Sequence, residues 1–505
     1  MNKCHSLWVI VLLSFSLGLA WGQDSTAQQP DVPPNNGQQQ PPAPATVNPV
    51  PNSENPPISG IDMPNLQPHA APLSYLQAGV HVSQSVDSNV QNALGGSSVS
   101  TISDGLGSLE LQRLWSNYVL SLDYLGGVGY FNVSGIGLRQ IEELGVNQKI
   151  TWKRGELGVR DAFSYQPEGT FGSSYGSVAV SGAALGGQGA FFGGTGLGAL
   201  GQVPRIMNLT LVDAVENLTP KSSVTVTGGY GFVHFLANDP GVGNSFIGNS
   251  QVSGEVGYDR LLGPHDQGAL VYGYQGFQFS TGVTFHSHVL QVMWGHRVSG
   301  RMDFLIGAGP QFTELNHVFS PVSNPTSADT TPPCELGGSL GNPVLECPTN
   351  DLRISTAGRA SLRYQFPKTS LDLSYEHFIT SGSGFFAGAE SDVARLAATR
   401  PLNRIWTAFS DIGFSRNSRI LPSSCGTTPA SQCPGVTANT YEYGFVGGGV
   451  RRNFGRNFKA YASYQFNDLS FDSSFCGSTG SCNRTSQRHV GTVGLDWTPR
   501  PMRLD

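Results

Sequence analysis

The segment from Leu352 to Phe366 alternates between apolar and polar residues with a period of two. Successive side chains of a β-strand point to opposite faces. The segment therefore predicts a strand with one apolar face and one face that carries Arg353, Arg359 and Arg363. The strand would run to roughly 14 residues, whereas strands of soluble proteins average about 5–6. Long strands that are apolar on one face and charged on the other are typical of transmembrane β-barrels, which have lipid outside and water inside.

A second alternating segment, Leu371 to Ile379, follows a Pro-Lys pair that acts as a turn signal. A two-residue turn at this pair would place Arg363 opposite Asp372 and Arg359 opposite Glu376. Opposite charges at paired positions stabilise neighbouring strands. The two segments therefore predict an antiparallel hairpin whose polar face is braced by ion pairs.

Comparable alternation continues from Leu73 to the C-terminus, and we predict an all-β fold, a transmembrane antiparallel β-barrel of about 18 strands. A count of about 16 is the alternative if the weakly patterned Val393–Thr399 and the Gly-rich Phe445–Arg451 lie in loops. The clearest strand, Tyr118–Tyr130, has an apolar row with aromatic residues at both ends, as expected at two headgroup layers. The predicted strands are centred near Val80, Leu111, Leu122, Val146, Val159, Leu211, Val226, Val256, Tyr272, Leu290, Ile306, Ala360, Leu373, Leu396, Ala408, Gly448, Ala462 and Val493.

Two acidic residues fit the alternation poorly, because Asp161 shares a face with Val159 and Asp213 shares a face with Leu211. A β-bulge that flips the register would explain them, and so would contact of these positions with a neighbour or with headgroups.

The connections between the predicted strands alternate between short and long, as in outer-membrane barrels with short periplasmic turns and long external loops. The short ones are Ser116-Asn117, Lys153–Gly155, Thr219–Lys221, Gly263–Gln267, Ser299-Gly300, Pro367-Lys368, Pro401–Asn403 and Gly455-Arg456. The long ones are Ser88–Ser100, Gln166–Pro204, Ala237–Gly248, Asn316–Asn350, Ser418–Thr437 and Ser473–Thr485.

Six cysteines follow the N-terminal segment, and they form three close pairs in the long connections: Cys334/Cys347, Cys425/Cys433 and Cys476/Cys482. An even set at short spacing in an exported chain predicts disulfides. All three would cap one rim of the barrel. Metal binding is the weaker reading, because the sequence has no Cys-x-x-Cys motif and no histidines cluster beside the pairs.

The N-terminus predicts export. Met1–Gly22 has a positive start, a short apolar core and a small-x-small cleavage site, which together indicate a signal peptide. Gln23–Pro72 is rich in Pro and Gln, so we expect a disordered periplasmic leader, and we assign 73–505 to the barrel. The net charge of -6 gives no basic surface for nucleic acid.

The region from Leu73 to Asp505 resembles bacterial outer-membrane porins in its alternation, aromatic girdles and loop asymmetry. The resemblance implies that a long loop narrows the lumen, and the candidate is Gln166–Pro204, which is apolar and Gly-rich where such loops are usually charged. It also implies a terminal aromatic residue that the assembly machinery reads. Here the last patterned aromatic residue is Trp497, eight residues before the end of the sequence.

Catalytic motifs are weak. The best candidate is His286-Ser287-His288, where the alternation puts both histidines on the face opposite the serine, so neither can deprotonate it. The Gly194–Gly198 run lacks the spacing and the lysine of a phosphate-binding loop. We therefore expect no enzyme, no cofactor and no metal.

The predicted inward face carries many charges, and a barrel of about 16–18 strands leaves an aqueous channel in which such charges select ions. The inward charged residues include Asp123, Glu143, Lys149, Arg160, Glu255, Asp259, Asp303, Arg353, Arg359, Arg363, Asp372, Glu376 and Asp411. The paired ones would brace the wall, and an excess arginine, Arg353, would favour anions locally.

Two hypotheses follow. The first is an outer-membrane channel for passive diffusion of small polar solutes or ions. The second is a surface-exposed structural or adhesive barrel, with a plugged lumen and disulfide-braced recognition loops. The expected partners are outer-membrane lipid and the assembly machinery, and a homo-oligomer is left open.

Overall fold

A computed structural model describes residues 74–91, 93–96, 98–133, 137–166, 204–236, 246–323, 335–339, 342–382, 384–421, 438–479 and 482–504. The expected signal peptide and the whole of the expected leader lie outside these ranges, as do most of Gln166–Pro204 and both cysteines of the pair Cys425/Cys433. Among the described residues, no helix is long and apolar enough to cross a membrane.

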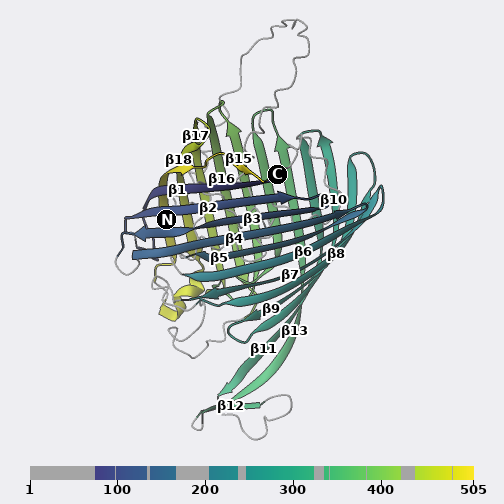
Figure 1. Cartoon of the computed structure of the whole chain (residues 1–505). Helices are drawn as coiled ribbons and strands as arrows, with labels where there is room; N and C mark the ends of the chain where they lie inside the picture. The colour runs from purple at the N-terminus through teal and green to yellow at the C-terminus, as the bar shows by residue number, and fades with distance from the viewer. Residues whose placement is uncertain are drawn as a thin grey trace, which may run out of the picture. The chain divides into compact units, whose positions relative to one another are not determined.

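The described chain is almost entirely antiparallel β-strand (Figure 1). The first ten strands are β1 (Tyr75–Asp87), β2 (Ser100–Leu114), β3 (Tyr118–Phe131), β4 (Gly137–Trp152), β5 (Gly155–Gln166), β6 (Arg205–Thr219), β7 (Ser222–Phe235), β8 (Asn249–Leu261), β9 (Asp266–Phe279) and β10 (Thr284–Ser299). The others are β11 (Met302–Ser323), β12 (Glu335–Ser339), β13 (Asn342–Gln365), β14 (Ser370–Thr380), β15 (Ala389–Pro401), β16 (Trp406–Arg419), β17 (Thr440–Phe454), β18 (Phe458–Phe471), β19 (Thr485–Trp497) and β20 (Met502–Arg503).

Eighteen of these strands, β1–β11 and β13–β19, form the wall, which closes where β19 pairs with β1. At this seam Val80 is the partner of Trp497 and Asp87 is the partner of Val490. Each of the 18 predicted centres falls in a different wall strand, so the predicted fold class and the count of 18 are confirmed. The short β20 extends the seam by pairing with the start of β1.

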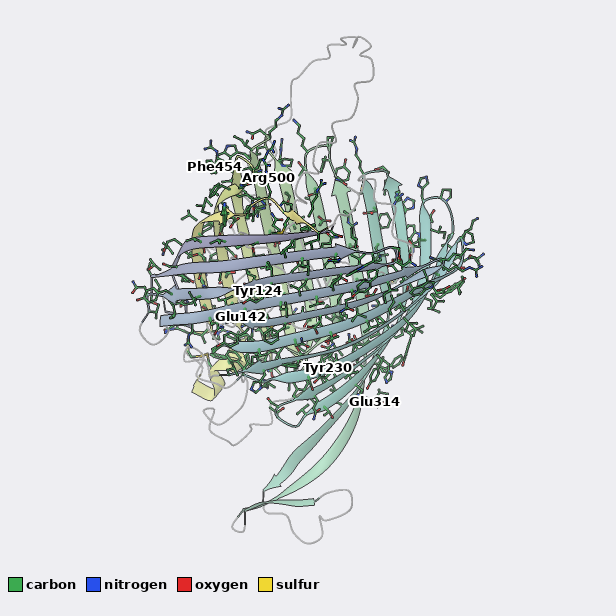
Figure 2. All side chains as sticks on the ribbon, in the orientation of Figure 1. Tyr124, Glu142, Tyr230, Glu314, Phe454 and Arg500 are labelled. Atoms are coloured by element: carbon green, nitrogen blue, oxygen red, sulfur yellow. A yellow bond between two sulfur atoms is a disulfide. The ribbon has the colours of Figure 1, made fainter. Side chains whose placement is uncertain are left out.

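The two faces of the wall differ as the alternation predicts. On β3, Val128 and Tyr130 are 44% and 53% exposed on the outer face, whereas Leu125 and Phe131 are 2% exposed and point inward. Figure 2 shows the side chains of this wall, with Tyr124 of β3 among those labelled. The apolar outer face is the surface that a lipid bilayer would cover.

The hairpin of β13 and β14 has the predicted register, because Arg359 is the partner of Glu376 and Arg363 is the partner of Asp372. The turn is closed by the N–H of Phe366, which donates to the carbonyl oxygen of Thr369 at 2.7 Å. The side-chain alternation and the Pro-Lys turn signal were therefore sufficient to set this register.

The barrel has a short-turn rim and a long-connection rim, which we name by the connections they carry. All five tryptophans of the barrel lie toward the short-turn rim: Trp115, Trp152, Trp294, Trp406 and Trp497. This is the aromatic girdle expected at a membrane interface. The long-connection rim is less regular than predicted, because the connections β3–β4 and β9–β10 are also short.

The predicted loop Asn316–Asn350 is wrong. Strand β11 continues to Ser323, β13 begins at Asn342, and the two remain paired from Asn316 outward. The hairpin therefore projects beyond the wall, with β12 paired to its end (Figure 1). The prediction failed because this stretch is rich in Pro, Thr and Asn, which favour turns. These residues are tolerated in a two-stranded hairpin whose outer edges pair with no further strand.

The two misfit acidic residues have different explanations. Leu211 and Val215 are 4% and 2% exposed and face inward beside Asp213, while Val212 is 41% exposed on the outer face. The assumption that the Leu211 row faces lipid is therefore wrong, and Asp213 needs no bulge at its own position. Asp161 does face outward, where it accepts hydrogen bonds from the side chains of Asn208 and Thr210 on β6.

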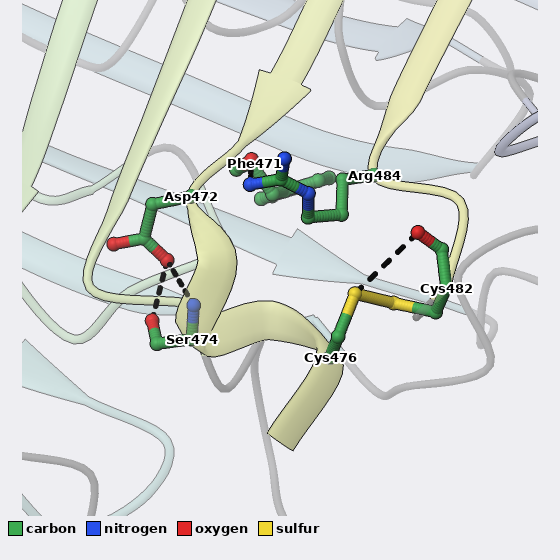
Figure 3. The surroundings of a disulfide bond; sticks show 6 residues. All are labelled: Phe471, Asp472, Ser474, Cys476, Cys482 and Arg484. Atoms are coloured by element: carbon green, nitrogen blue, oxygen red, sulfur yellow. Dashed lines mark hydrogen bonds between the residues drawn. A yellow bond between two sulfur atoms is a disulfide. The ribbon is translucent and has the colours of Figure 1, made fainter. Parts of the chain in front are cut away.

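One of the three predicted disulfides lies in the described residues, between Cys476 and Cys482 at the long-connection rim (Figure 3). The side chains of Cys334, Cys347, Cys425 and Cys433 lie outside what the structure describes. Beside the bridge, the 3₁₀ turn Ser473–Thr479 is joined to the end of β18 by Asp472, which accepts hydrogen bonds from the hydroxyl and N–H groups of Ser474.

Asp472 also accepts hydrogen bonds from the backbone N–H groups of Asn439 and Thr440, which precede or begin β17. Burial alone would raise the pKa of the Asp472 carboxyl. The hydrogen bonds from Ser474, Asn439 and Thr440 outweigh it and lower the pKa. The ionised carboxylate thus ties two neighbouring connections of the rim together.

We predict that Asp472→Ala will weaken this rim by about 1 kcal/mol, because the N–H groups of Asn439, Thr440 and Ser474 lose a charged acceptor. Amide exchange at these positions should become roughly fivefold faster. Since the folded pKa is lowered, the wild type should lose the same protection as the pH falls below about 4. Asp468→Ala, on the outer face of β18, is the matched control, and equal exchange in the two variants would refute the anchoring role.

We predict that Val256→Lys, at the middle of the outer face of β8, will destabilise the barrel by about 2–4 kcal/mol in lipid, because it places a charge against hydrocarbon. The control is Thr227→Lys on the neighbouring β7, which faces inward beside Glu255. The stability of both variants can be measured by urea unfolding in lipid vesicles, with the folded fraction read from the different gel mobility of folded and unfolded barrels. Equal destabilisation would mean that the outer face is not the lipid face.

Candidate functional site

The inner surface of the wall carries a charged cluster formed by Glu255 of β8, Arg359 of β13 and Glu376 of β14, which we call the triad. The three residues line one cavity of ≈ 40 Å³, room for about three water molecules. Two carboxylates thus flank one guanidinium in a space that water can enter. Such a group interacts with passing ions through its local field.

Glycines on neighbouring strands make room for the triad. Glu255 is the partner of Gly273 on β9, and Arg359 is the partner of Gly307 on β11. A Cβ on Gly307 would lie 2.9 Å from the Cγ of Met293 and 3.5 Å from the Cγ of Arg359. The absence of side chains at these two positions lets the long charged side chains lie along the wall.

Three glutamines, Gln275, Gln291 and Gln311, line the same cavity from β9, β10 and β11. Arg359 donates a hydrogen bond from Nη2 to the Oε1 of Gln291 at 3.0 Å, and its Nη1 has no hydrogen-bond partner among the described residues. The site therefore offers charged groups of both signs together with amide donors and acceptors, which suits polar solutes rather than apolar ones.

The other predicted inward charges lie outside the triad cavity. Arg363 approaches Asp372 at 3.6 Å between Nε and Oδ1, and Lys149 pairs with Glu156 at 2.5 Å. Asp123 is the cross-strand partner of Glu110, and Glu143 is buried on the inner face of β4. The predicted charges thus do not form one ring, and of the thirteen predicted inward charges, three line the triad cavity: Glu255, Arg359 and Glu376.

Arg353 is not an excess charge. Its Nη2 pairs with Glu390 of β15, and Glu390 also lies 3.3 Å from the Nε2 of His377. We expected a local preference for anions because Arg353 was taken to be unpaired. Its pairing with Glu390 removes the reason for that expectation.

A second feature was not predicted: apolar side chains cross the lumen toward the long-connection rim. The connection between β14 and β15 folds inward and carries Phe385 and Phe386, which are 0% and 1% exposed. Phe385 contacts Phe246, just before β8, with ring centroids 5.5 Å apart, and Phe471, at the end of β18, at 5.4 Å. We call this group, with Phe235 and Phe475, the aromatic partition.

The partition joins nearly opposite parts of the wall. Phe246 contacts Phe235 at the end of β7 at 5.1 Å, and Phe471 stacks on Phe475 at 4.7 Å. In the closed wall, β7 and β18 are separated by nine strands in one direction (β8–β11 and β13–β17) and by seven in the other (β1–β6 and β19). The chain of rings therefore spans the lumen. A second apolar cluster, around Phe277, Phe285 and Ile379, lies near the same long-connection rim.

The connection also contacts the segment before β8 through its backbone, because the N–H of Ile247 donates to the carbonyl oxygen of Gly384 at 2.9 Å. Gly382, Gly384 and Gly388 have φ of 76°, 84° and 89°, which only glycine adopts readily. In the sequence this feature corresponds to the Gly-rich run 382–388 with two adjacent phenylalanines. The run has no period of two, so a search for alternating residues does not detect it.

The motif His286-Ser287-His288 has the predicted arrangement. Ser287 faces inward, where it accepts a hydrogen bond from the Nε2 of Gln311 at 2.7 Å. His286 and His288 face outward and lie 2.8 Å from the hydroxyls of Tyr274 and Tyr272. The serine and the histidines are thus on opposite sides of the wall and form no nucleophile–base pair.

No family model and no curated relative matches this sequence. Among solved structures, OccK2 (OpdF) of Pseudomonas aeruginosa aligns with a TM-score of 0.38 and 8% identity, over 84% of this chain and 98% of that one. OccAB2 of Acinetobacter baumannii gives 0.39 and 7%, over 85% and 98%. The ferric-catecholate import receptor Fiu of E. coli K12 gives 0.39 and 6%, over 84% and 81%.

These values carry no argument about function. The strand pairing of this chain itself confirms the predicted architecture, a closed wall of 18 antiparallel strands.

Proposed function

We propose that this protein is an outer-membrane channel for diffusion of small polar solutes or ions, in which the triad of Glu255, Arg359 and Glu376 sets charge preference. The observation that carries the proposal is the closed wall of 18 strands with charged and amide groups on its inner face. A barrel of this size encloses more space than its own side chains fill. Polar groups on an inner wall need hydrogen-bond or ionic partners, which come from the protein, from water or from a polar solute.

The triad is the part of the lumen where a passing ion meets charges of both signs in one small cavity. A unit charge about 5 Å from an ion contributes ~0.8 kcal/mol even in bulk water, which changes the local ion concentration about fourfold. Removing one member should therefore shift the selectivity, and the direction depends on the sign of the charge removed.

We predict opposite shifts for two variants in planar bilayers under a salt gradient. Arg359→Gln should move the reversal potential toward cation selectivity, because Glu255 and Glu376 lose their counter-charge. Glu376→Gln should move it toward anion selectivity, and the double variant should lie between them. The permeability ratio should change about fourfold in each single variant.

The control is Arg400→Gln, which removes an arginine from the outer face of β15 and should leave the reversal potential unchanged. If all variants fold and conduct with wild-type selectivity, the triad does not lie on the ion path. If the folded wild type never conducts, the channel itself is refuted.

A second function has an observation of its own. The aromatic partition spans the lumen, as a structural or adhesive barrel with a plugged bore would require. In that case the barrel would present its long connections at the cell surface and pass nothing. The conductance of the folded wild-type protein separates the two functions.

A further inference from the structure

The aromatic partition conflicts with an open pore. Phe385 is fully buried between Phe246 and Phe471, so a polar solute crossing there would have to displace an apolar contact. A constriction lined by apolar side chains excludes water and acts as a barrier even where it is wide enough for an ion. A channel with this structure therefore needs a way to move the partition.

The connection that carries Phe385 can move without opening the wall. Strands β14 and β15 stay paired up to Thr380 and Ala389, and the hydroxyl of Thr380 lies 2.8 Å from that of Ser391. The base of the connection is thus fixed in the sheet. Beyond its base, the connection is held by ring contacts with Phe246, Phe471 and Tyr441, by Arg419 over the ring of Phe386, and by backbone hydrogen bonds from Ile247 to Gly384 and from Ile420 to Gly388. None of these contacts is a pairing between wall strands.

Glycines bracket the two phenylalanines. Gly382 and Gly384 precede them, Gly388 follows them, and all three have φ between 76° and 89°. Glycine occupies both halves of the φ range at little cost, so these positions can absorb a large change in backbone direction. Phe385 and Phe386 therefore lie in a short connection that has conformationally free glycines on both sides of them.

We propose that Phe385 and Phe386 form a hydrophobic gate, closed when Phe385 bridges Phe246 and Phe471 and open when the β14–β15 connection leaves those rings. The inference rests on the proposed channel function and adds its regulation. Opening breaks apolar contacts and the hydrogen bond from Ile247 to Gly384, while the pairing of the wall strands is unchanged.

Single-channel recording of the full-length protein tests the gate. The wild type should be closed most of the time, with brief openings to one conductance level. Phe385→Ser should raise the open fraction by about tenfold or more, because the ring makes several aromatic contacts only in the closed state. The conductance of the open level should stay the same, because the open path does not include the partition.

Two further variants guard against a folding defect at one position. Phe246→Ser removes the ring before β8 that Phe385 contacts. It should act like Phe385→Ser, with no additional effect in the double variant. The control is Phe414→Ser on the outer face of β16, which should leave the open fraction unchanged.

A backbone variant provides a second, independent readout. Gly382→Ala places a Cβ 2.6 Å from the carbonyl oxygen of Phe386 at φ 76°, so it disfavours the closed arrangement and should raise the open fraction. Gly282→Ala in the β9–β10 connection also has positive φ, at 84°, but no atom lies within 4 Å of its Cβ. It should strain its own turn and leave gating unchanged.

The outcomes separate the gate from the channel. A wild type that conducts without closing, and whose conductance level rises in Phe385→Ser, has a fixed constriction, and the gate is wrong. The gate is also refuted if the wild type conducts and Phe385→Ser, Phe246→Ser and Gly382→Ala all leave its gating unchanged. If neither the wild type nor any folded variant conducts, the proposed channel function fails and the gate fails with it.

Discussion

The structure depends on one constraint, which is that a backbone surrounded by hydrocarbon must satisfy its own hydrogen bonds. A β-sheet meets it only by closing, since an open edge leaves a row of unpaired N–H and C=O groups. Here the closure is the pairing of β1 with β19, from Val80 with Trp497 to Asp87 with Val490. Once the sheet is closed, every strand of the wall has two neighbours, and each residue of the wall must face either the outside or the lumen.

This two-sided arrangement explains why much of the fold could be read from the sequence. Where the outer face is apolar and the inner face is polar, a period of two gives the strand, its faces and the partner register, as for Arg359 with Glu376. The weakly patterned segments around Val393 and Gly448 proved to be strands β15 and β17, because a closed wall requires them whatever their side chains.

The same rule fails where the inner face is also apolar. The row of Leu211 and Val215 alternates just as a lipid-facing row does, and only its burial beside Ala162 and Leu209 shows that it points inward. The aromatic partition was missed for a related reason. Its members come from connections and strand ends, so no periodicity links Phe246, Phe385 and Phe475, and only the closed wall brings them together.

The seam has a consequence for how the chain reaches this state. Its side-chain contacts join residues about 400 positions apart: Arg488 with Asp87, Asp496 with His81, and Thr492 with Ser85. These are among the largest sequence separations in the molecule, so the loop-closure entropy opposing them is among the largest too. The hairpins join strands that are adjacent in the sequence and can form one after another, but the ring cannot be completed until its final strand is available. Until then, the backbone N–H and C=O groups at both edges of the incomplete sheet need temporary hydrogen-bond partners.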